Sequence, residues 1–111
     1  MRSEIIINIA KDYTKTPGGR FIHEGDYSGE DFRKSILLPA FKKAIETDST
    51  LIVILDGGYG YPPSFLEEAF GGLVRETKDS RVQDIIIISE EEPSQIKKIK
   101  GYISKELGDK K

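Results

Sequence analysis

Few residues of this chain have the type and spacing that catalysis requires. His23 is the only histidine, the chain has no cysteine, and no serine lies in a G-x-S-x-G motif. These facts argue against a serine triad, a thiolate nucleophile and a cysteine-based zinc site. The carboxylates Asp12, Glu24, Asp26 and Asp56 lack the regular ligand spacing of a calcium loop. We therefore expect no metal and no cofactor, and we predict that the protein is not an enzyme.

A glycine-rich loop at residues 57–63 is the next candidate for chemistry. It reads Gly-Gly-Tyr-Gly-Tyr-Pro-Pro and connects an apolar run to a helical pattern. Gly58 and Gly60 match the first two glycines of a G-x-G-x-x-G motif, but Pro63 occupies the third position. A proline there cannot allow the close approach of helix and strand that the third glycine provides. No Lys-Ser or Lys-Thr follows the loop, so it is not a P-loop either.

Ser64, at the end of this loop, has the most informative surroundings. With Glu67 three residues later it forms a capping box, so we predict that Ser64 is the N-cap of a helix over Ser64–Thr77. The same position is also suited to phosphorylation. The free N–H groups and the positive dipole end of a helix N-terminus tolerate a phosphate well.

Gly71 and Gly72 lie inside the same predicted helix. Each glycine there costs about 1 kcal/mol relative to alanine, so some other contact must offset the loss. Their helical position near Glu68 and Arg75 predicts an accessible face on which the backbone of a partner can lie closely. Close packing against a neighbouring element of the same chain is the alternative explanation.

The elements that must position these residues follow from hydrophobic periodicity. Apolar runs predict strands at Ile5–Ile9, Leu51–Leu55 and Ile85–Ile88. Because all three runs are apolar on both faces, we expect them to be adjacent central strands of one sheet. Arg20–His23 is predicted to be a short second strand that pairs with the first. The turn Pro17–Arg20 is expected to hold the Arg20 guanidinium near the Gly57–Ser64 loop or the Asp56 carboxylate.

Three helices are predicted between and after these strands. The first begins with a capping box at Ser28 and carries an apolar stripe to Ile45, with Pro39 expected to kink it or to start a second segment. The second is the Ser64–Thr77 helix, and the third follows Pro93. The resulting order β-β-α-β-α-β-α predicts an α/β fold with a mixed, mostly parallel four-stranded sheet packed with helices.

The composition bounds the class of protein. The 111 residues are the length of one domain, which we place at 1–111. A net charge of −2 gives no basic surface for nucleic acid. No apolar run approaches the ~20 residues of a membrane span, and no signal peptide is evident at the N-terminus. We expect a cytoplasmic protein that binds neither nucleic acid nor membranes.

Several motifs together resemble one family, the STAS-like domain of unknown function, which is related to the anti-sigma-factor antagonists of the STAS superfamily. The resemblance covers nearly the whole chain, from Ile5 to about Leu107. It is carried in order by Lys11–Thr14, Thr16–Arg20, Ser28–Arg33, Leu37–Ala40, Leu55–Gly57 and Ser64–Leu73.

The resemblance implies regulation rather than a reaction. STAS antagonists bind a histidine-kinase-like ATPase, which phosphorylates a serine at the start of a helix that follows a central strand. Ser64 is the matching position here, although this chain has Pro62-Pro63-Ser64-Phe65 where those proteins commonly have D-S-S-G. The resemblance therefore implies a protein partner of the ATPase class, with Ser64 as the candidate phosphoacceptor.

Three functional hypotheses result. The first is a STAS-like signalling module that binds another protein and is switched at Ser64. The second is a small-ligand or nucleotide sensor that uses the glycine-rich loop as a lid, and the third is a small enzyme with carboxylates Asp56, Glu67 and Glu68. The residues expected to contact a partner or ligand are Arg20, Asp56, Gly58, Tyr59, Tyr61, Glu68, Gly71 and Gly72.

Overall fold

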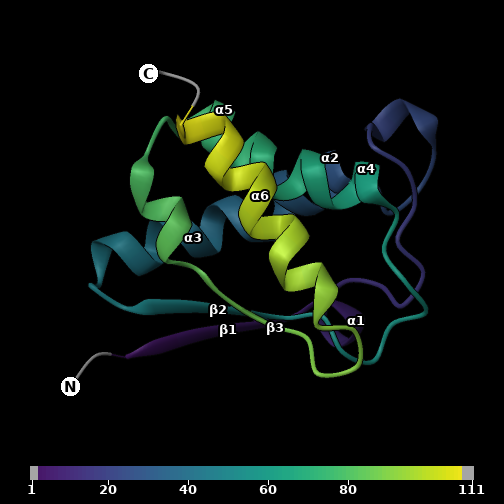
Figure 1. Cartoon of the computed structure of the whole chain (residues 1–111), viewed down its shortest axis with the longest axis horizontal. Coiled ribbons are helices and arrows are strands. Elements are labelled where there is room, and N and C mark those ends of the chain that lie inside the picture. Colours follow the sequence, from purple (N-terminus) through teal and green to yellow (C-terminus); the bar gives the residue numbers. More distant parts are fainter. Residues whose placement is uncertain (1–2, 109–111) are drawn as a thin grey trace.

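Figure 1 shows the computed structural model of the protein, which describes residues 3–108. The chain forms a small α/β domain with a three-stranded sheet. In chain order, its elements are β1 (Glu4–Asn8), α1 (Ile9–Asp12), the 3₁₀ helix η1 (Ile22–Glu24), α2 (Gly29–Phe32), the π turn η2 (Arg33–Leu37), α3 (Leu38–Glu46), β2 (Thr50–Ile54), α4 (Pro63–Leu66), the π turn η3 (Glu67–Gly71), α5 (Gly72–Thr77), the 3₁₀ helix η4 (Ser80–Asp84), β3 (Ile86–Ile88) and α6 (Ser94–Gly108).

The three strands are parallel and lie in the order β1-β2-β3. The register places Ile6, Ile52 and Ile86 in one row across the sheet. Parallel neighbours that follow one another in this order and are joined by right-handed crossovers place every connecting helix on the same face. Figure 1 shows this arrangement, with α2 to α6 gathered on one side of the strands.

The hydrophobic core lies between the sheet and these helices. Ile7, Val53 and Ile87 point from the inner face of the three strands, and each is at most 6% exposed. Three phenylalanines fill the space opposite them, and all three are fully buried. They are Phe32, Phe65 and Phe70.

The predicted strand at Arg20–His23 is wrong, because this segment contains the 3₁₀ helix η1. The Glu24 carboxylate accepts hydrogen bonds from the backbone N–H groups of Arg20 (2.9 Å) and Phe21 (3.0 Å). These bonds curl the backbone and occupy the donors that a strand would use for pairing. The sheet consequently has three parallel strands rather than four mixed ones.

The expectation that all three apolar strands are central is also wrong. Among the strands of residues 3–108, only β2 has a neighbour on both sides, whereas β1 and β3 form the edges of the sheet. The side chain of Ile6 is 54% exposed and that of Ile86 is 46% exposed. An apolar run on both faces indicates that both faces suit burial, but here the helices cover only one of them.

The two long helical stretches each contain a π turn. In the first, η2 precedes Pro39, and the N–H of Leu38 donates to the carbonyl of Arg33 five residues earlier. This wider turn leads into α3, where Pro39 lies in the first turn and its missing N–H has no cost. Of the two predicted alternatives, a kinked helix or a second segment, the structure has the second, since α3 begins at Leu38 with Pro39 in its first turn. In the second stretch, η3 separates α4 from α5.

The last helix, α6, packs its predicted stripe against the core. Ile99 and Ile103 are buried, while Ile96 and Leu107 are partly buried against the same cluster. Within residues 3–108, no helix combines the length and the apolar character needed to cross a membrane.

Candidate functional site

The helix that contains Ser64 begins one residue earlier than predicted. Pro62 is the N-cap and Pro63 is the first helical residue, so Ser64 is the second. Two successive prolines fix φ near the helical value, and a proline at the first position loses no hydrogen bond. The prediction that Ser64 caps the helix is therefore wrong. Its side chain is half-buried and makes no hydrogen bond to any described residue.

One turn further along, a network of charges covers the helix. Glu67 forms a short ion pair with Arg20 Nη1 and another, of 2.7 Å, with Arg75 Nη1. Arg75 Nη1 also lies 2.7 Å from Glu106 Oε2 in α6. The hydrogen bond from Arg75, together with the one from Arg20, lowers the pKa of Glu67 despite partial burial. Glu67 thus joins the N-terminal loop, its own helix and α6 as one charged cluster.

A second ion pair lies deeper in the same layer. Arg33 and Glu68 are each 8% exposed, and Arg33 Nη1 lies 2.6 Å from Glu68 Oε2. The same Nη1 donates to the Glu68 carbonyl oxygen at 2.8 Å, and Arg33 Nε lies 3.0 Å from Glu76 Oε1. In the π turn η3 the Gly72 N–H donates to the carbonyls of Ala69 and Glu67. In a regular α-helix the Gly72 N–H would donate to the Glu68 carbonyl four residues earlier. Because of the π turn it does not, and Arg33 donates to that carbonyl instead.

The two glycines of the helix lie beside these charged side chains. Both Gly71 and Gly72 are buried, so the predicted accessible face is wrong. A β carbon at Gly72 would overlap Arg33 Nη1, and one at Gly71 would lie 2.6 Å from Glu67 Oε2. Close packing inside the domain, the alternative explanation, accounts for Gly72, because the buried Arg33 guanidinium occupies the space over it. At Gly71 the nearest atoms end the flexible Glu67 side chain.

Arg20 is held against the helix by its loop. Backbone hydrogen bonds of 2.9 Å join Gly29 N to Gly19 O and Glu30 N to Arg20 O. A β carbon at Gly29 would overlap the Phe65 carbonyl, so the start of α2, to which the loop is hydrogen-bonded, lies directly on the first turn of the Ser64 helix. Arg20 consequently pairs with Glu67 and lies 3.4 Å from Glu68 Oε1. Two positions were predicted for Arg20, near the Gly57–Ser64 loop or at the Asp56 carboxylate. The second is wrong, because the Asp56 carboxylate accepts backbone N–H groups and Arg20 pairs with the helix that follows the loop.

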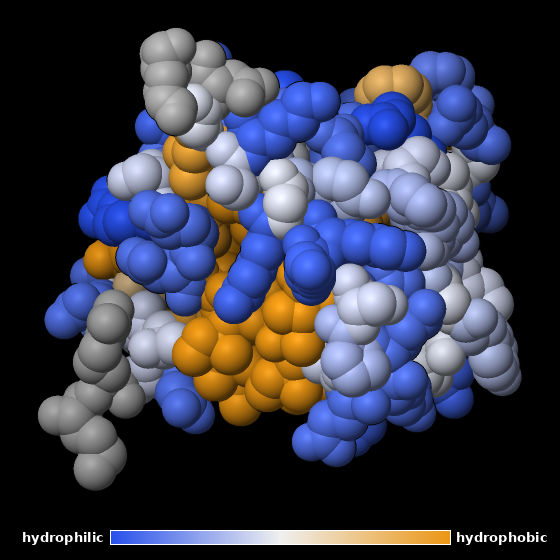
Figure 2. All heavy atoms as spheres, in the orientation of Figure 1, coloured by the Kyte–Doolittle hydropathy of each residue, from blue (hydrophilic) through white to orange (hydrophobic). Residues whose placement is uncertain are grey.

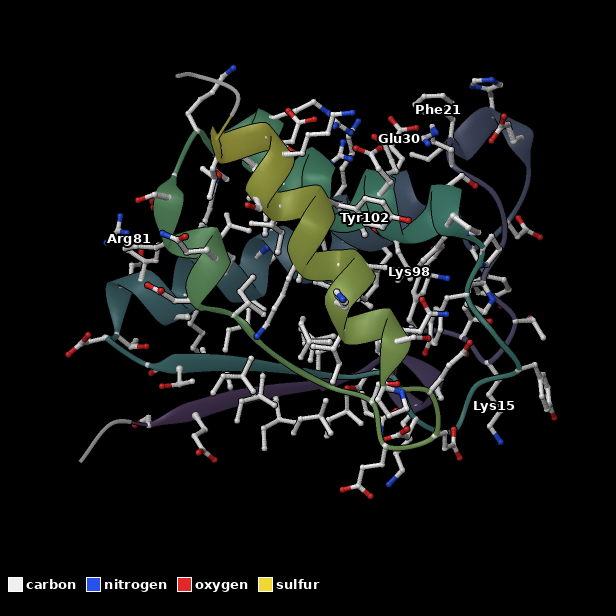
Figure 3. All side chains as sticks on the ribbon, in the orientation of Figure 1. Lys15, Phe21, Glu30, Arg81, Lys98 and Tyr102 are labelled. Atoms are coloured by element: carbon white, nitrogen blue, oxygen red, sulfur yellow. The ribbon has the colours of Figure 1, made fainter. Side chains whose placement is uncertain are left out.

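The loop ends in an exposed apolar tip, which we define as Phe21, Ile22 and Tyr27. Their side chains are 37%, 49% and 46% exposed. Figure 3 shows Phe21 at the outer end of the helical layer near Glu30, whose carboxylate accepts the Ile22 N–H at 2.9 Å. The Arg20 guanidinium lies 5.9 Å from the centre of the Phe21 ring. Exposed aromatic residues beside an arginine have the composition of protein-binding surfaces.

The base of this loop is fixed by a hydrogen-bonded tyrosine. Tyr13 donates from its hydroxyl to Asp31 Oδ2 at 2.5 Å, and Asp31 N in turn donates to Ser28 Oγ at 3.0 Å. Burial and the hydrogen bond to Asp31 raise the pKa of Tyr13. The predicted capping box at Ser28 is confirmed in its first half, since Ser28 caps α2 through this bond.

Asp56 belongs to a separate cluster at the carboxyl ends of β2 and β3. Its two carboxylate oxygens accept the backbone N–H groups of Glu91 (2.8 Å) and Glu90 (3.0 Å). The Gly57 N–H donates to Glu91 Oε1 at 2.9 Å in return. These bonds tie the glycine-rich loop to the turn before α6, so the Asp56 carboxylate has a structural role.

A pocket of about 190 Å³ opens beside this cluster. Asp56, Gly58, Tyr59 and Tyr61 line it together with Glu91 and Glu92. Tyr59 is 80% exposed, whereas Tyr61 is half-buried and donates to the Leu55 carbonyl at 2.8 Å. Burial, with Asp56 and Glu91 nearby, raises the pKa of Tyr61 to about 12.

The predicted site residues therefore divide into two groups. Asp56, Gly58, Tyr59 and Tyr61 share the pocket. Ser64, Glu68, Gly71 and Gly72 belong to the Ser64 helix, and Arg20 contacts that helix from the N-terminal loop. The three carboxylates of the enzyme hypothesis fall in different groups, because Asp56 binds backbone amides while Glu67 and Glu68 bind arginines. Among residues 3–108, no set of three side chains is placed to hold a metal ion.

Sequence reasoning assigned no role to two residues that organise the helix layer. They are Arg33, which enters the space over Gly72, and Arg75, which joins Glu67 to Glu106. The pair of glycines was the sequence feature that could have indicated these arginines. Glycines inside a helix leave space beside the backbone, and large side chains fill that space here.

Comparison with protein families assigns the fold. Residues 28–95 match the model of the STAS-like domain of unknown function (DUF4325). This stretch is more than half of the chain and runs from α2 through β2 and β3. The protein therefore belongs to the family of STAS-like domains of unknown function. No curated protein and no solved structure gives a significant match.

Proposed function

We propose that this protein is a regulatory protein-interaction module of the STAS-like type, switched by phosphorylation of Ser64. The proposal rests on the position of Ser64 and on its unbonded hydroxyl. Its hydroxyl follows the central strand β2 and its loop, lies in the first helical turn, and is bound to no described residue. A phosphate there replaces no structural hydrogen bond and meets the positive end of the helix dipole.

A phosphate on Ser64 would change the charged cluster beside it. Residues three positions apart are neighbours on a helix surface, so the phosphate would face Glu67. It would add about −1.5 to −2 charges at neutral pH and compete with Glu67 for the Arg20 guanidinium. Arginine binds phosphate bidentately, and Arg20 carries the exposed tip of Phe21, Ile22 and Tyr27 on its loop. The switch would thus alter both the charge and the position of the partner-binding surface.

The proposed partner is a histidine-kinase-like ATPase encoded in the same genome, as the family resemblance implies. A partner that accepts the neutral serine would be repelled after phosphorylation, because Glu67 and Glu68 already make the local field acidic. Gly71 and Gly72 are buried and cannot contact a partner. The proposed partner-binding surface therefore consists of the first turn of the Ser64 helix and the exposed apolar tip.

The test is binding of the ATPase to the wild type, Ser64→Ala and Ser64→Asp by calorimetry. We expect Ser64→Ala to bind like the wild type and Ser64→Asp to bind at least about tenfold more weakly, which is about 1.4 kcal/mol. Ser94→Asp is the matched control, because Ser94 is exposed and begins α6. Equal binding by Ser64→Asp and Ser94→Asp, with both folded, would exclude a switch at Ser64.

The pocket beside Asp56 supports the second hypothesis, a small-ligand sensor. Its volume of about 190 Å³ and its acidic lining favour a small cation and disfavour a nucleotide. A thermal-shift screen of small amines against nucleotides separates the two. Stabilisation by amines that Tyr61→Phe or Glu91→Gln removes would favour a sensor over a pure interaction module.

A further inference from the structure

The free edge of β3 presents backbone groups that have no hydrogen-bond partner. The Leu55 N–H donates to the Ile88 carbonyl at 2.8 Å, and the register pairs Ile88 with Ile54. Backbone groups of successive strand residues point to opposite sides, so Ile86 and Ile88 bond to β2 while the N–H and carbonyl of Ile87 point away from it. Neither group of Ile87 is hydrogen-bonded among residues 3–108. Free groups of this kind at a sheet edge are a template for a further strand.

A hollow of about 230 Å³ opens beside this edge, between β3 and α6. Its apolar wall consists of Ile85, Ile87 and Ile103, each at most 6% exposed. Figure 2 shows hydrophobic residues gathered below α6, with hydrophilic side chains along their upper border. An apolar cavity of about 150 Å³ holds a benzene molecule, so this hollow has room for one large apolar side chain.

The rim of the hollow is basic. Lys100 lines it from α6, and Lys97 lies one turn earlier on the same side of that helix. Both side chains are exposed, and neither forms an ion pair within the described part of the chain. These charges favour an occupant with acidic side chains. They disfavour pairing with β3 of a second copy, which would bring the same lysines together.

The opposite edge of the sheet, at β1, is less suited to pairing. The Asn8 N–H donates to Asp12 Oδ2 at 2.8 Å, and α1 begins at the next residue. β1 also carries the exposed carboxylate of Glu4, and charged side chains protect a sheet edge from further strands. β3 has no charged residue over Ile86–Ile88. The two edges therefore differ, and β3 is the one that is open to a strand.

We propose that the β3 edge binds a short extended segment of a partner protein as a fourth strand, with an apolar residue in the hollow and an acidic residue beside Lys100. Backbone hydrogen bonds hold the segment, and the hollow selects its side chain, as in other cases of strand addition. The surface is independent of the proposed switch, because Ser64 does not line the hollow.

The direction of the added strand decides which of its residues enters the hollow. Antiparallel pairing is slightly more stable per residue than parallel pairing, so the segment runs antiparallel to β3. One of its residues then exchanges both hydrogen bonds with Ile87, and its side chain points to the same face of the sheet, into the hollow. The residues on either side of it point to the outer face, beside Ile86 and Ile88.

The test uses a synthetic peptide of about seven residues, with a central leucine, valines on both sides of it and glutamates at the ends. A matched control peptide carries a methyl group on the leucine backbone nitrogen, which removes one N–H donor and changes no side chain. Amide chemical shifts and hydrogen exchange of the isotope-labelled protein report the site. We expect the peptide to shift the Ile87 signal, to slow exchange of the Ile87 N–H and to bind at least about tenfold more tightly than the control.

Variants of exposed α6 residues separate filling of the hollow from charge attraction. Ser104 lines the hollow, so Ser104→Leu should fill it and weaken binding at least about tenfold while circular dichroism stays unchanged. Lys100→Glu should weaken binding more than Lys105→Glu, the matched control, because Lys105 does not line the hollow. Absence of binding, equal affinity of the two peptides, or shifts at Ile6 instead of Ile87 would overturn the proposal. So would a dimer in sedimentation that the peptide dissociates, since a second copy would then occupy the edge.

Discussion

Arg33 and Glu68 form a buried ion pair at the contact between the two π turns, with 2.6 Å between Arg33 Nη1 and Glu68 Oε2. The guanidinium also binds the Glu68 carbonyl oxygen and Glu76, so its Nε and Nη1 donors both go to the helix that carries Ser64. The pair fixes α2 and η2 to the Ser64 helix, and through α2 it fixes the loop that presents Arg20.

Removing one partner of this pair should destabilise the fold strongly. Glu68→Gln or Arg33→Met leaves a buried charge without its nearest partner, which costs up to about 3–5 kcal/mol and less where Glu76 or Arg20 still compensates it. We expect that loss in the free energy of unfolding measured with urea. The double variant Arg33→Met/Glu68→Leu leaves no unpaired charge and should lose clearly less than the sum of the single losses. Additive losses would contradict a direct coupling between the two side chains.

The space over Gly72 gives a second prediction about stability. An alanine inside a helix is normally about 1 kcal/mol better than a glycine. At Gly72 the added β carbon would overlap Arg33 Nη1, so we expect Gly72→Ala to destabilise the protein by about 1–3 kcal/mol.

Gly101→Ala is the matched control for this variant. Gly101 lies inside α6 and is exposed, and a β carbon there would meet no atom within 4 Å. This variant should raise the free energy of unfolding by about 0.5–1 kcal/mol. If both glycine variants stabilise the protein, then Arg33 does not occupy the space over Gly72.

Tyr61 should titrate well above the ordinary range for tyrosine. Its pKa of about 12 results from burial and from the nearby Asp56 and Glu91. Because the folded-state pKa is raised, the neutral hydroxyl stabilises the fold below about pH 10, and this contribution is lost as the pH rises further. Tyrosinate absorbance measured against pH should show a late component that Tyr61→Phe reduces, and the remainder belongs to Tyr13, whose pKa is also raised. Titration of all the tyrosines near pH 10 would contradict this environment.

The element order of the α/β fold was largely predictable from the sequence, but its sheet was not. Apolar runs located the strands, and the capping box at Ser28 located α2. The strand predicted at Arg20–His23 failed because Glu24 captures two backbone N–H groups, an interaction that strand propensity does not register. The open outer face was missed for a different reason. Apolar residues on both faces of a strand indicate that both faces suit burial. Which face the helices cover depends on the side of the sheet on which the crossover connections lie.

The candidate site was predictable in its location and not in its contacts. The position of Ser64 after a central strand was correct, whereas its role as N-cap failed because the prolines before it already begin the helix. Gly71 and Gly72 were recognised as costly, but their burial depends on Arg33, which is distant in sequence. Long-range partners of this kind leave no periodic pattern in the sequence.

Glu67 provides the last prediction, because it connects Arg20 and Arg75 and has a pKa below its ordinary value. A lowered pKa in the folded state means that the ionised carboxylate stabilises the fold above the unfolded pKa of about 4.3. This contribution is lost as the pH falls from that value through the lower folded-state pKa.

We therefore expect the free energy of unfolding of the wild type to fall over this acidic range, and the fall to be smaller in Glu67→Gln. The measurement is urea unfolding as a function of pH, with Glu46→Gln as the control, because Glu46 is exposed and forms no ion pair among the described residues. The amide signals of Phe21 and Ile22 should shift over the same pH range, since Arg20 is released when Glu67 is protonated. Identical acid profiles for Glu67→Gln and Glu46→Gln would show that Glu67 does not hold the loop to the helix.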